Sequence, residues 1–243
     1  MRVEPIAGSR RAPAPLARPQ AVIFDMDGLL LDTEVLAARA WDEAAAAHGA
    51  TFDRDLALRL VGRNFRDCIG LVRAHYDADY PVDAVLGCWH ATYDAIVARD
   101  GVKVKRGAHE LLEWLDAQGI PRAVATSTRR ERAAEKLRDA GLLARMHALV
   151  GGNEIARGKP APDIYLEAAR RLGVTAGACC VLEDSEPGVR GALAAGMTAI
   201  MVPDIAPPTE ELLALGPHVL GALNEVHERW RAASSARAVE SSP

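Results

Sequence analysis

The chain has 243 residues, of which 49% are hydrophobic and 26% are charged, an ordinary globular composition that is sufficient for a sizeable core. A formal net charge of −4 and an aromatic content of 5% exclude both a cationic field for nucleic acid and an aromatic platform for bases, so we expect no nucleic-acid partner. No apolar run reaches the ~18 residues of a membrane span and no apolar signal segment is present, so we expect a cytoplasmic protein without a membrane partner.

The chain opens with a proline-rich leader. Four prolines within its first 19 residues argue against an amphipathic transit helix, and we predict that residues 1–19 are disordered. The apolar run Ala21–Phe24 follows and ends in Asp-Met-Asp-Gly. This pattern is typical of a buried parallel strand that leads into a polar turn.

The next stretch, to about residue 105, is helical in pattern and contains no convincing strand. Helix-like segments are expected at 34–48, 53–60, 65–76 and 82–98. An insert directly after the first strand lies above the carboxyl edge of the sheet, where it could close on a ligand. We therefore predict an all-α cap domain over residues 34–105.

The remainder of the chain alternates between strand-like and helix-like segments. Apolar runs bounded by Gly, Pro or small polar residues predict strands at 120–125, 148–150, 179–182 and 198–202. Helical periodicity lies between them, at 108–118, 130–140, 163–172 and 188–195.

Such alternation predicts an α/β fold, a doubly wound parallel sheet with a Rossmann-like core. We assign residues 20–33 and 106–229 to this core domain. The Ala-, Ser- and Arg-rich end of the chain, residues 230–243, is predicted to be a disordered tail.

Polar groups follow four of the predicted strands. Asp25 and Asp27 lie just after the first strand, where Gly28 permits a turn that leaves both carboxylates facing one crevice. The other strand ends carry hydroxyls at 126–128, a lysine at 159 and two acids at 183–184. An acidic turn, a helix cap or a surface lysine would account for each group taken singly. Because sites form at the carboxyl ends of parallel strands, the groups together predict one site.

Residues 25–34, 125–127, 158–163 and 182–185 match the four motifs of the haloacid dehalogenase superfamily. The resemblance runs from Ala21 to about Asp204 and is to the helical-cap subgroup, which includes sugar-phosphate and pseudouridine-phosphate phosphatases and β-phosphoglucomutase. It implies an Mg²⁺-dependent phosphatase that hydrolyses a small phosphate monoester, a sugar phosphate or a nucleotide-like ester, through an aspartyl-phosphate. The implied partner is therefore a small phosphorylated metabolite.

The resemblance also implies roles for the four acids. Asp25 would be the nucleophile, and Asp27 would be the acid that protonates the leaving oxygen and then the base that activates water. Mg²⁺ would lie between Asp25, the backbone carbonyl of Asp27 and the carboxylate of Asp184, with Glu183 as the second choice of ligand.

Phosphate binding and substrate choice are assigned to different parts of the chain. By the same resemblance, Lys159 would neutralise phosphoryl oxygens, and Thr126 with the Ser127 N–H would bind them as charge develops. Relatives present a substrate-reading loop where this chain has residues 61–66. Arg63 and Arg66 are therefore candidates for binding the polar part of a substrate, although exposed arginines are usually only solvated.

Two other functions stay open at this point. A β-phosphoglucomutase-like sugar phosphomutase is one alternative, but that branch carries a histidine where Ala37 stands here. A non-catalytic ligand-binding module is the more remote one, since such a protein would be expected to have lost Asp25, Asp27 or Lys159. The sequence leaves the oligomeric state open and is compatible with a monomer.

Overall fold

The structure, a computed structural model, describes residues 16–240, with side chains for residues 16–233. Its centre is a sheet of six parallel strands in the order β3-β2-β1-β4-β5-β6. The strands are β1 (Ala21–Phe24), β2 (Arg122–Thr126), β3 (Ala148–Gly151), β4 (Cys179–Glu183), β5 (Thr198–Met201) and β6 (His218–Val219). β1 lies between β2 and β4, so its end is flanked by theirs.

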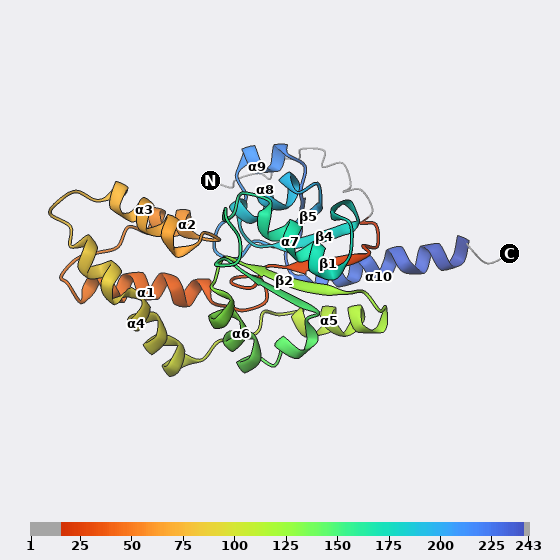
Figure 1. Cartoon of the computed structure of the whole chain (residues 1–243), viewed down its shortest axis with the longest axis horizontal. Coiled ribbons are helices and arrows are strands. Elements are labelled where there is room, and N and C mark those ends of the chain that lie inside the picture. The colour runs from red at the N-terminus through yellow and green to blue at the C-terminus, as the bar shows by residue number, and fades with distance from the viewer. Residues whose placement is uncertain (1–15, 241–243) are drawn as a thin grey trace, which may run out of the picture.

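Helices cover both faces of this sheet (Figure 1). Val22 and Phe24 point to one face, where they pack with α5 (Ala108–Ala117), α6 (Arg130–Asp139) and α10 (Leu223–Glu240). Ala21 and Ile23 point to the other face, where they pack with α7 (Asp163–Leu172), α8 (Glu186–Ala194) and α9 (Glu210–Ala214). This alternation of side chains along a buried strand confirms the predicted doubly wound α/β fold.

Four of the five helices between β1 and β2 form the predicted helical insert, to the left in Figure 1. They are α1 (Glu34–Ala46), α2 (Arg54–Leu60), α3 (Phe65–His75) and α4 (Val82–Asp100). Their buried side chains form clusters separate from those of the sheet, and the rings of Trp41 and Phe52 stack at 4.7 Å. We call this insert the cap. Its boundaries at 34 and 105 stay predictions.

The two connections between core and cap run side by side. The N–H of Asp32 donates to the carbonyl of Lys103, and the N–H of Lys105 donates to the carbonyl of Leu30, both at 2.9 Å. The ammonium of Lys105 also lies 2.5 Å from Asp204, in the loop after β5. The two connections are therefore held to each other by backbone hydrogen bonds, and Lys105 also holds one of them to the core.

The chain ends differ in part from prediction. Most of the predicted leader, residues 1–15, lies outside the described residues, while Leu16 is buried against the sheet and Arg18 donates to the carbonyl of Gln118 at 2.9 Å. The predicted disordered tail is wrong as far as Glu240, because α10 continues to that residue. The Trp230 ring is buried and stacks on Trp114 at 5.9 Å, and no Gly or Pro lies between Trp230 and Glu240 to end the helix earlier.

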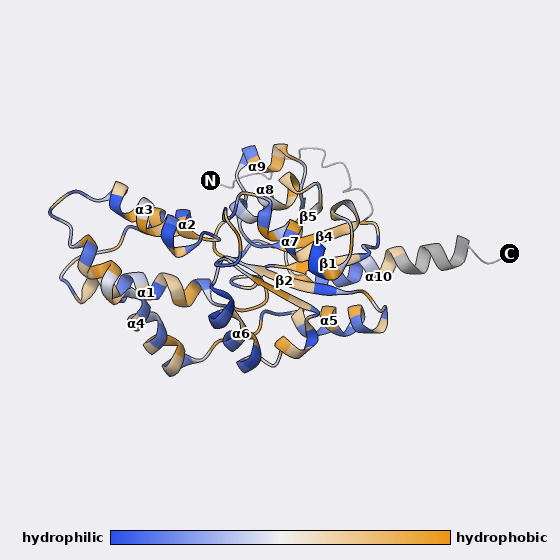
Figure 2. Cartoon of the chain, viewed as in Figure 1, coloured by the Kyte–Doolittle hydropathy of each residue, from blue (hydrophilic) through white to orange (hydrophobic). Residues whose placement is uncertain are grey.

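Apolar residues concentrate on the strands and on the sides of the helices that face them, whereas much of α6 is hydrophilic (Figure 2). None of the helices in the described part of the chain is long and apolar enough to cross a membrane. No strong sequence pattern predicts the short elements β6 and α9. They lie after β5, and β6 is the edge strand of the sheet next to β5.

Candidate active site

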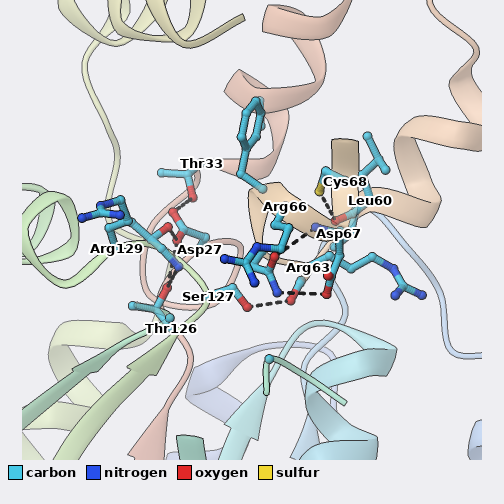
Figure 3. A pocket seen from close by; sticks show the side chains of 18 of the residues that line it. Asp27, Thr33, Leu60, Arg63, Arg66, Asp67, Cys68, Thr126, Ser127 and Arg129 are labelled. Carbon is cyan, nitrogen blue, oxygen red and sulfur yellow. Dashed lines mark hydrogen bonds between the residues drawn. The ribbon is translucent and has the colours of Figure 1, made fainter. Parts of the chain in front are cut away.

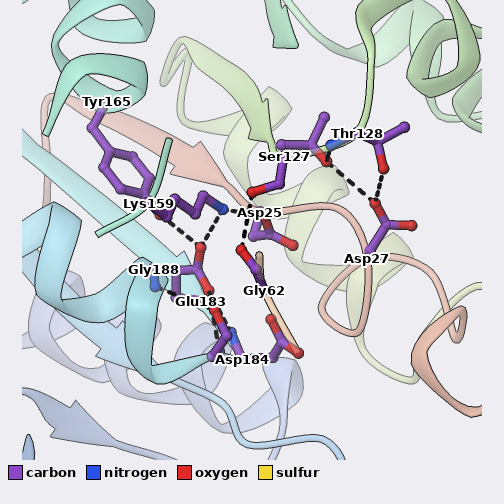
Figure 4. A network of polar contacts seen from close by, with 12 residues as sticks. Asp25, Asp27, Gly62, Ser127, Thr128, Lys159, Tyr165, Glu183, Asp184 and Gly188 are labelled. Atoms are coloured by element: carbon purple, nitrogen blue, oxygen red, sulfur yellow. Dashed lines mark hydrogen bonds and ion pairs between the residues drawn. The ribbon is translucent and has the colours of Figure 1, made fainter. Parts of the chain in front are cut away.

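The carboxyl ends of β1, β2 and β4 bring the predicted polar residues together (Figure 4). Asp25 follows β1 directly, and its N–H donates to the carbonyl of Leu182 on β4 at 2.9 Å. Lys159, from the loop between β3 and α7, contacts both Asp25 and Glu183 with its ammonium. A buried lysine between two carboxylates is thus the centre of the site.

The Asp25 side chain is 7% exposed. Burial raises its pKa to about 8, the neighbouring Lys159 ammonium offsets part of this rise, and the charge of Glu183 adds to it. Burial alone would lower the pKa of Lys159, but the two carboxylates outweigh burial and raise it. Lys159 is therefore held as a cation beside the candidate nucleophile.

Glu183 accepts more hydrogen bonds than any other acid of the site. Its Oε1 accepts from Lys159 at 2.5 Å and from the Tyr165 hydroxyl at 2.6 Å. Its Oε2 accepts from the N–H of Asp184 and from the N–H and hydroxyl of Ser185, at 2.9 to 3.1 Å. A methyl group built on Gly188, in the first turn of α8, would overlap this carboxylate. Five donors around Glu183 make it an anchor for Lys159.

Asp184 is the opposite case. Both of its carboxylate oxygens are buried and have no hydrogen-bond partner among the described residues. Burial, followed by the charges of Glu183 and Asp25, raises its pKa well above the ordinary value. Ligand atoms of Asp25, Glu183 and Asp184 all lie within 4.8 Å of one another, and the backbone at Gly28 passes so close to Asp184 that a side chain there would overlap it.

A site of this composition fits a hard divalent cation. Carboxylate oxygens are the ligands that Mg²⁺ and Ca²⁺ prefer, and a bound cation would offset the cost of two buried oxygens without donors. Because Glu183 already accepts five hydrogen bonds, Asp25 and Asp184 are the better candidates for direct ligands.

Asp27 lies on the other side of Asp25 and accepts four side-chain hydrogen bonds. Oδ1 accepts from Thr33 at 2.8 Å and from Lys136 at 2.9 Å, and Oδ2 accepts from Thr126 at 3.2 Å and from Thr128 at 2.7 Å. Burial would raise the pKa of Asp27, but the Lys136 charge and these hydrogen bonds outweigh it and lower the pKa. In this arrangement, without substrate, Asp27 is an ionised carboxylate, so it must take up a proton before it can act as an acid.

The cap touches the core at the turn that follows β2. The Ser127 hydroxyl donates to the carbonyl of Gly62 at 2.9 Å, so the loop between α2 and α3 lies directly on the turn after β2. Gly62 has a φ of +74°, and a side chain there would overlap Ser185. Arg63 and Arg66 flank this contact, and both line the space between core and cap (Figure 3).

A cleft of about 930 Å³ lies between the core and the cap. Glu34 lines it and has a pKa raised to about 8, first by burial and then by the charges of Asp27 and Asp25. Cations and aromatic rings make up much of the remaining wall; they are Arg63, Arg66, Arg129, Arg132, Lys136, Arg157, Trp41, Phe65, Trp89 and Tyr93.

The structure brings Asp25, Lys159, Glu183 and Asp184 into one cluster, and Thr126 into contact with Asp27. Arg63 and Arg66 line the same cleft, but the Arg63 guanidinium donates to the carbonyl of Arg59 at 2.9 Å. Their assignment to the substrate stays a prediction.

Sequence reasoning assigned no role to three residues that contact the site; they are Thr33, Lys136 and Tyr165. For one of them a signal was present. Arg129, Arg132 and Lys136 follow one another at spacings of three and four residues, which places them on one side of a helix that begins at the turn after the second predicted strand.

Comparison with known proteins adds the family. Residues 19–196 match the family model of haloacid dehalogenase-like hydrolases. The chain is 33% identical over 181 residues to the phosphorylated carbohydrates phosphatase of Thermotoga maritima, which covers 74% of this chain and 83% of that protein. It is also 30% identical over 211 residues to the bifunctional riboflavin kinase/FMN phosphatase of Arabidopsis thaliana, covering 86% of this chain but only 55% of that protein's length.

A solved structure agrees with these matches. CbbY from Rhodobacter sphaeroides in complex with phosphate superposes with a TM-score of 0.71 at 29% identity, over 86% of this chain and 96% of that one. Fold, motif positions and sequence similarity therefore agree. The chain belongs to the haloacid dehalogenase-like hydrolase family.

Proposed function

We propose that the chain is a phosphatase that depends on a divalent metal ion, in the first instance Mg²⁺, and hydrolyses a small phosphate monoester through a phosphorylated Asp25. One observation carries the proposal: a buried carboxylate, a buried lysine and two unpartnered buried oxygens of Asp184 meet at the end of the central strand. Such a cluster costs stability unless it binds charge, and clusters of this kind concentrate at functional sites.

The reaction has two displacements. In the first, an oxygen of Asp25 attacks phosphorus, the bond to the leaving oxygen breaks, and Asp27 gives that oxygen a proton. In the second, water attacks the phosphorylated Asp25, Asp27 takes the proton of that water, and inorganic phosphate leaves. At the end Asp25 is again a carboxylate and Asp27 again carries the proton with which it entered the first displacement.

Offsetting negative charge is the task of the surrounding residues. Lys159 lies against the attacking carboxylate, and the Thr126 hydroxyl and Ser127 N–H lie at the end of the neighbouring strand, where they can bind phosphoryl oxygens. Asp25, Asp184 and the backbone carbonyl of Asp27 would hold the cation. Bound there, it would supply further positive charge to the phosphoryl group.

The cleft favours a substrate larger than phosphate itself. Its volume of about 930 Å³ and its mixed cationic and aromatic wall suit a sugar phosphate or a nucleotide-like ester. The phosphomutase alternative is less well supported, because Ala37 lines the cleft where the mutase branch carries histidine.

Phosphate release from a panel of esters tests the proposal. We suggest glucose 6-phosphate, glycerol 3-phosphate, uridine monophosphate, FMN and p-nitrophenyl phosphate, each with MgCl₂ and with EDTA. Release with Mg²⁺ and none with EDTA is expected for at least one ester. No metal-dependent release from any ester would overturn the phosphatase assignment and favour a non-catalytic module.

The nucleophile has its own test. Asp25→Asn keeps the size of the side chain but removes the attacking oxygen, so turnover should fall by a factor of about 10³ or more while circular dichroism stays unchanged. Retained turnover would refute the role of Asp25. Formation of an isomerised sugar phosphate faster than free phosphate would instead identify a mutase.

A further inference from the structure

Lys136 is a cation of the cleft that the two displacements do not use. It comes from α6 of the core, and its side chain is only 15% exposed. Its ammonium lies 2.9 Å from Oδ1 of Asp27 and 4.9 Å from the centre of the Tyr93 ring, which belongs to the cap helix α4. A single, mostly buried ammonium thus contacts the candidate proton carrier and the cap at the same time.

The other donors to Asp27 are of a different kind. Three are hydroxyls, from Thr33, Thr126 and Thr128. A hydroxyl can rotate and can also accept a hydrogen bond, whereas an ammonium only donates and its bond to a carboxylate is charge-assisted. Among the side chains that the structure describes, Lys136 is the one charged donor to Asp27. It therefore contributes most to where Oδ1 lies.

The cap side of this contact is equally specific. An ammonium over an aromatic face is attracted by the ring, and the attraction is stronger when water is excluded. The Tyr93 ring is 4% exposed and stacks on Trp89 of the same helix at 5.4 Å, so it is fixed within the cap. Movement of α4 away from the core would remove this face from Lys136.

We propose that Lys136 is a positioning residue for Asp27, and that together with Tyr93 it holds the Asp27 carboxyl in place for proton transfer while the cap is seated on the core. The inference rests on the proposed role of Asp27 as acid and base. Lys136 itself exchanges no proton: the proton passes from Asp27 to the leaving oxygen as its bond to phosphorus breaks, and Asp27 regains one from the attacking water.

Dependence on the leaving group distinguishes this role from a structural one. An alkyl phosphate needs a proton on its leaving oxygen, whereas p-nitrophenolate departs as a stable anion. Since kcat/KM reports the steps up to departure of the leaving group, Lys136→Met should lower kcat/KM about 100-fold for the best alkyl ester of the panel. For p-nitrophenyl phosphate the loss should stay below about threefold. Lys136→Arg should restore part of the alkyl activity.

Two further variants complete the design. Tyr93→Leu removes the aromatic face and should change the ratio of alkyl to aryl kcat/KM in the same direction as Lys136→Met, but less. Arg132, one turn earlier on α6, pairs with Asp94 of the cap and has no contact with Asp27 among those described. Arg132→Met should therefore change both kcat/KM values by the same factor.

Three outcomes would overturn the inference: an equal loss of both activities in Lys136→Met, no loss at all, or a ratio changed as strongly by Arg132→Met. Melting temperatures of all variants show whether each is folded, and Lys136→Arg provides the answer if Lys136→Met is not. This inference alone would be refuted if the wild type is active, Asp25→Asn is inactive and Lys136→Met has unchanged activity. An active Asp25→Asn would refute the proposed function.

Discussion

Two adjacent acids at the end of β4 differ sharply in their surroundings. Glu183 accepts hydrogen bonds from five donors, while both oxygens of Asp184 have none among the described residues. The difference follows from the strand, because successive side chains point to opposite faces. One acid therefore holds Lys159, and the other is left for a ligand from outside the chain.

Asp184→Asn should lower metal affinity without destabilising the metal-free protein. Removing the acid takes away a candidate ligand but also a buried group without donors, whose charged form is costly. In EDTA we expect the melting temperature to equal or exceed that of the wild type. Added MgCl₂ should raise the melting temperature of the wild type but not that of Asp184→Asn.

Asp83→Asn is the matched control, because the Asp83 side chain is 85% exposed on α4. It should respond to MgCl₂ as the wild type does. An equal Mg²⁺-induced rise in Asp184→Asn would show that this acid does not hold the metal.

At the scale of elements, the sequence predicts the central strands and the residues that follow them. Parallel strands place their carboxyl ends at one edge, so Asp25, Lys159 and Asp184 could be grouped without knowing any distance. Lys136 and Tyr165 could not be found in this way. Each lies within a helix, where the direction of one side chain depends on how the helix packs.

Composition misled the prediction for the end of the chain. Residues 231–240 are rich in Ala, Ser and Arg, which suggests disorder, yet Ala and Arg also favour helix and nothing there interrupts it. The buried Trp230 packs α10 against α5, so the first half of the helix is fixed on the core and the second half can continue from it. Tertiary packing, which composition does not report, decided the outcome.

The first turn of α8 should tolerate no side chain at Gly188. A methyl group there would overlap the Glu183 carboxylate, and shifting that carboxylate would move Lys159. Gly188→Ala is expected to lower the free energy of unfolding by about 1–3 kcal/mol and to reduce kcat. Urea denaturation and steady-state kinetics measure the two effects.

Gly87→Ala in α4 is the comparison, because a methyl group there meets no atom within 4 Å. It should raise the free energy of unfolding by about 0.5–1 kcal/mol, as alanine does in a helix interior. Equal effects of the two substitutions would contradict the close contact at Gly188.

At the scale of the whole molecule, the buried acids set how stability depends on pH. Asp25 and Glu34 have pKa values of about 8, chiefly through burial, so the folded protein retains protons that the unfolded chain releases near pH 4. Because the folded state then binds more protons, the free energy of unfolding of the metal-free protein should fall as pH rises toward 8. Carboxyls with a lowered pKa, such as Asp27, stabilise the folded protein at neutral pH, and this contribution to the free energy of unfolding is lost only below about pH 4.

The effect of the buried acids on the free energy of unfolding is clearest between pH 7 and 8. The lowered pKa values of His90 and His218, due first to burial, act in the opposite direction but only up to about pH 6.5. Urea midpoints in EDTA should decrease across pH 7 to 8, and less so in Asp25→Asn. A midpoint that increases with pH in the wild type would contradict the assignment of buried, protonated acids.

The contact at Gly62 also bears on how such a protein can evolve. The cap meets the turn after β2 there through the backbone carbonyl of Gly62, and Gly62 has no room for a side chain. Mutations elsewhere in the cap can therefore remodel the walls of the cleft while the docking point stays the same. Selection for a new ester could proceed in the cap without disturbing the residues that carry out the chemistry.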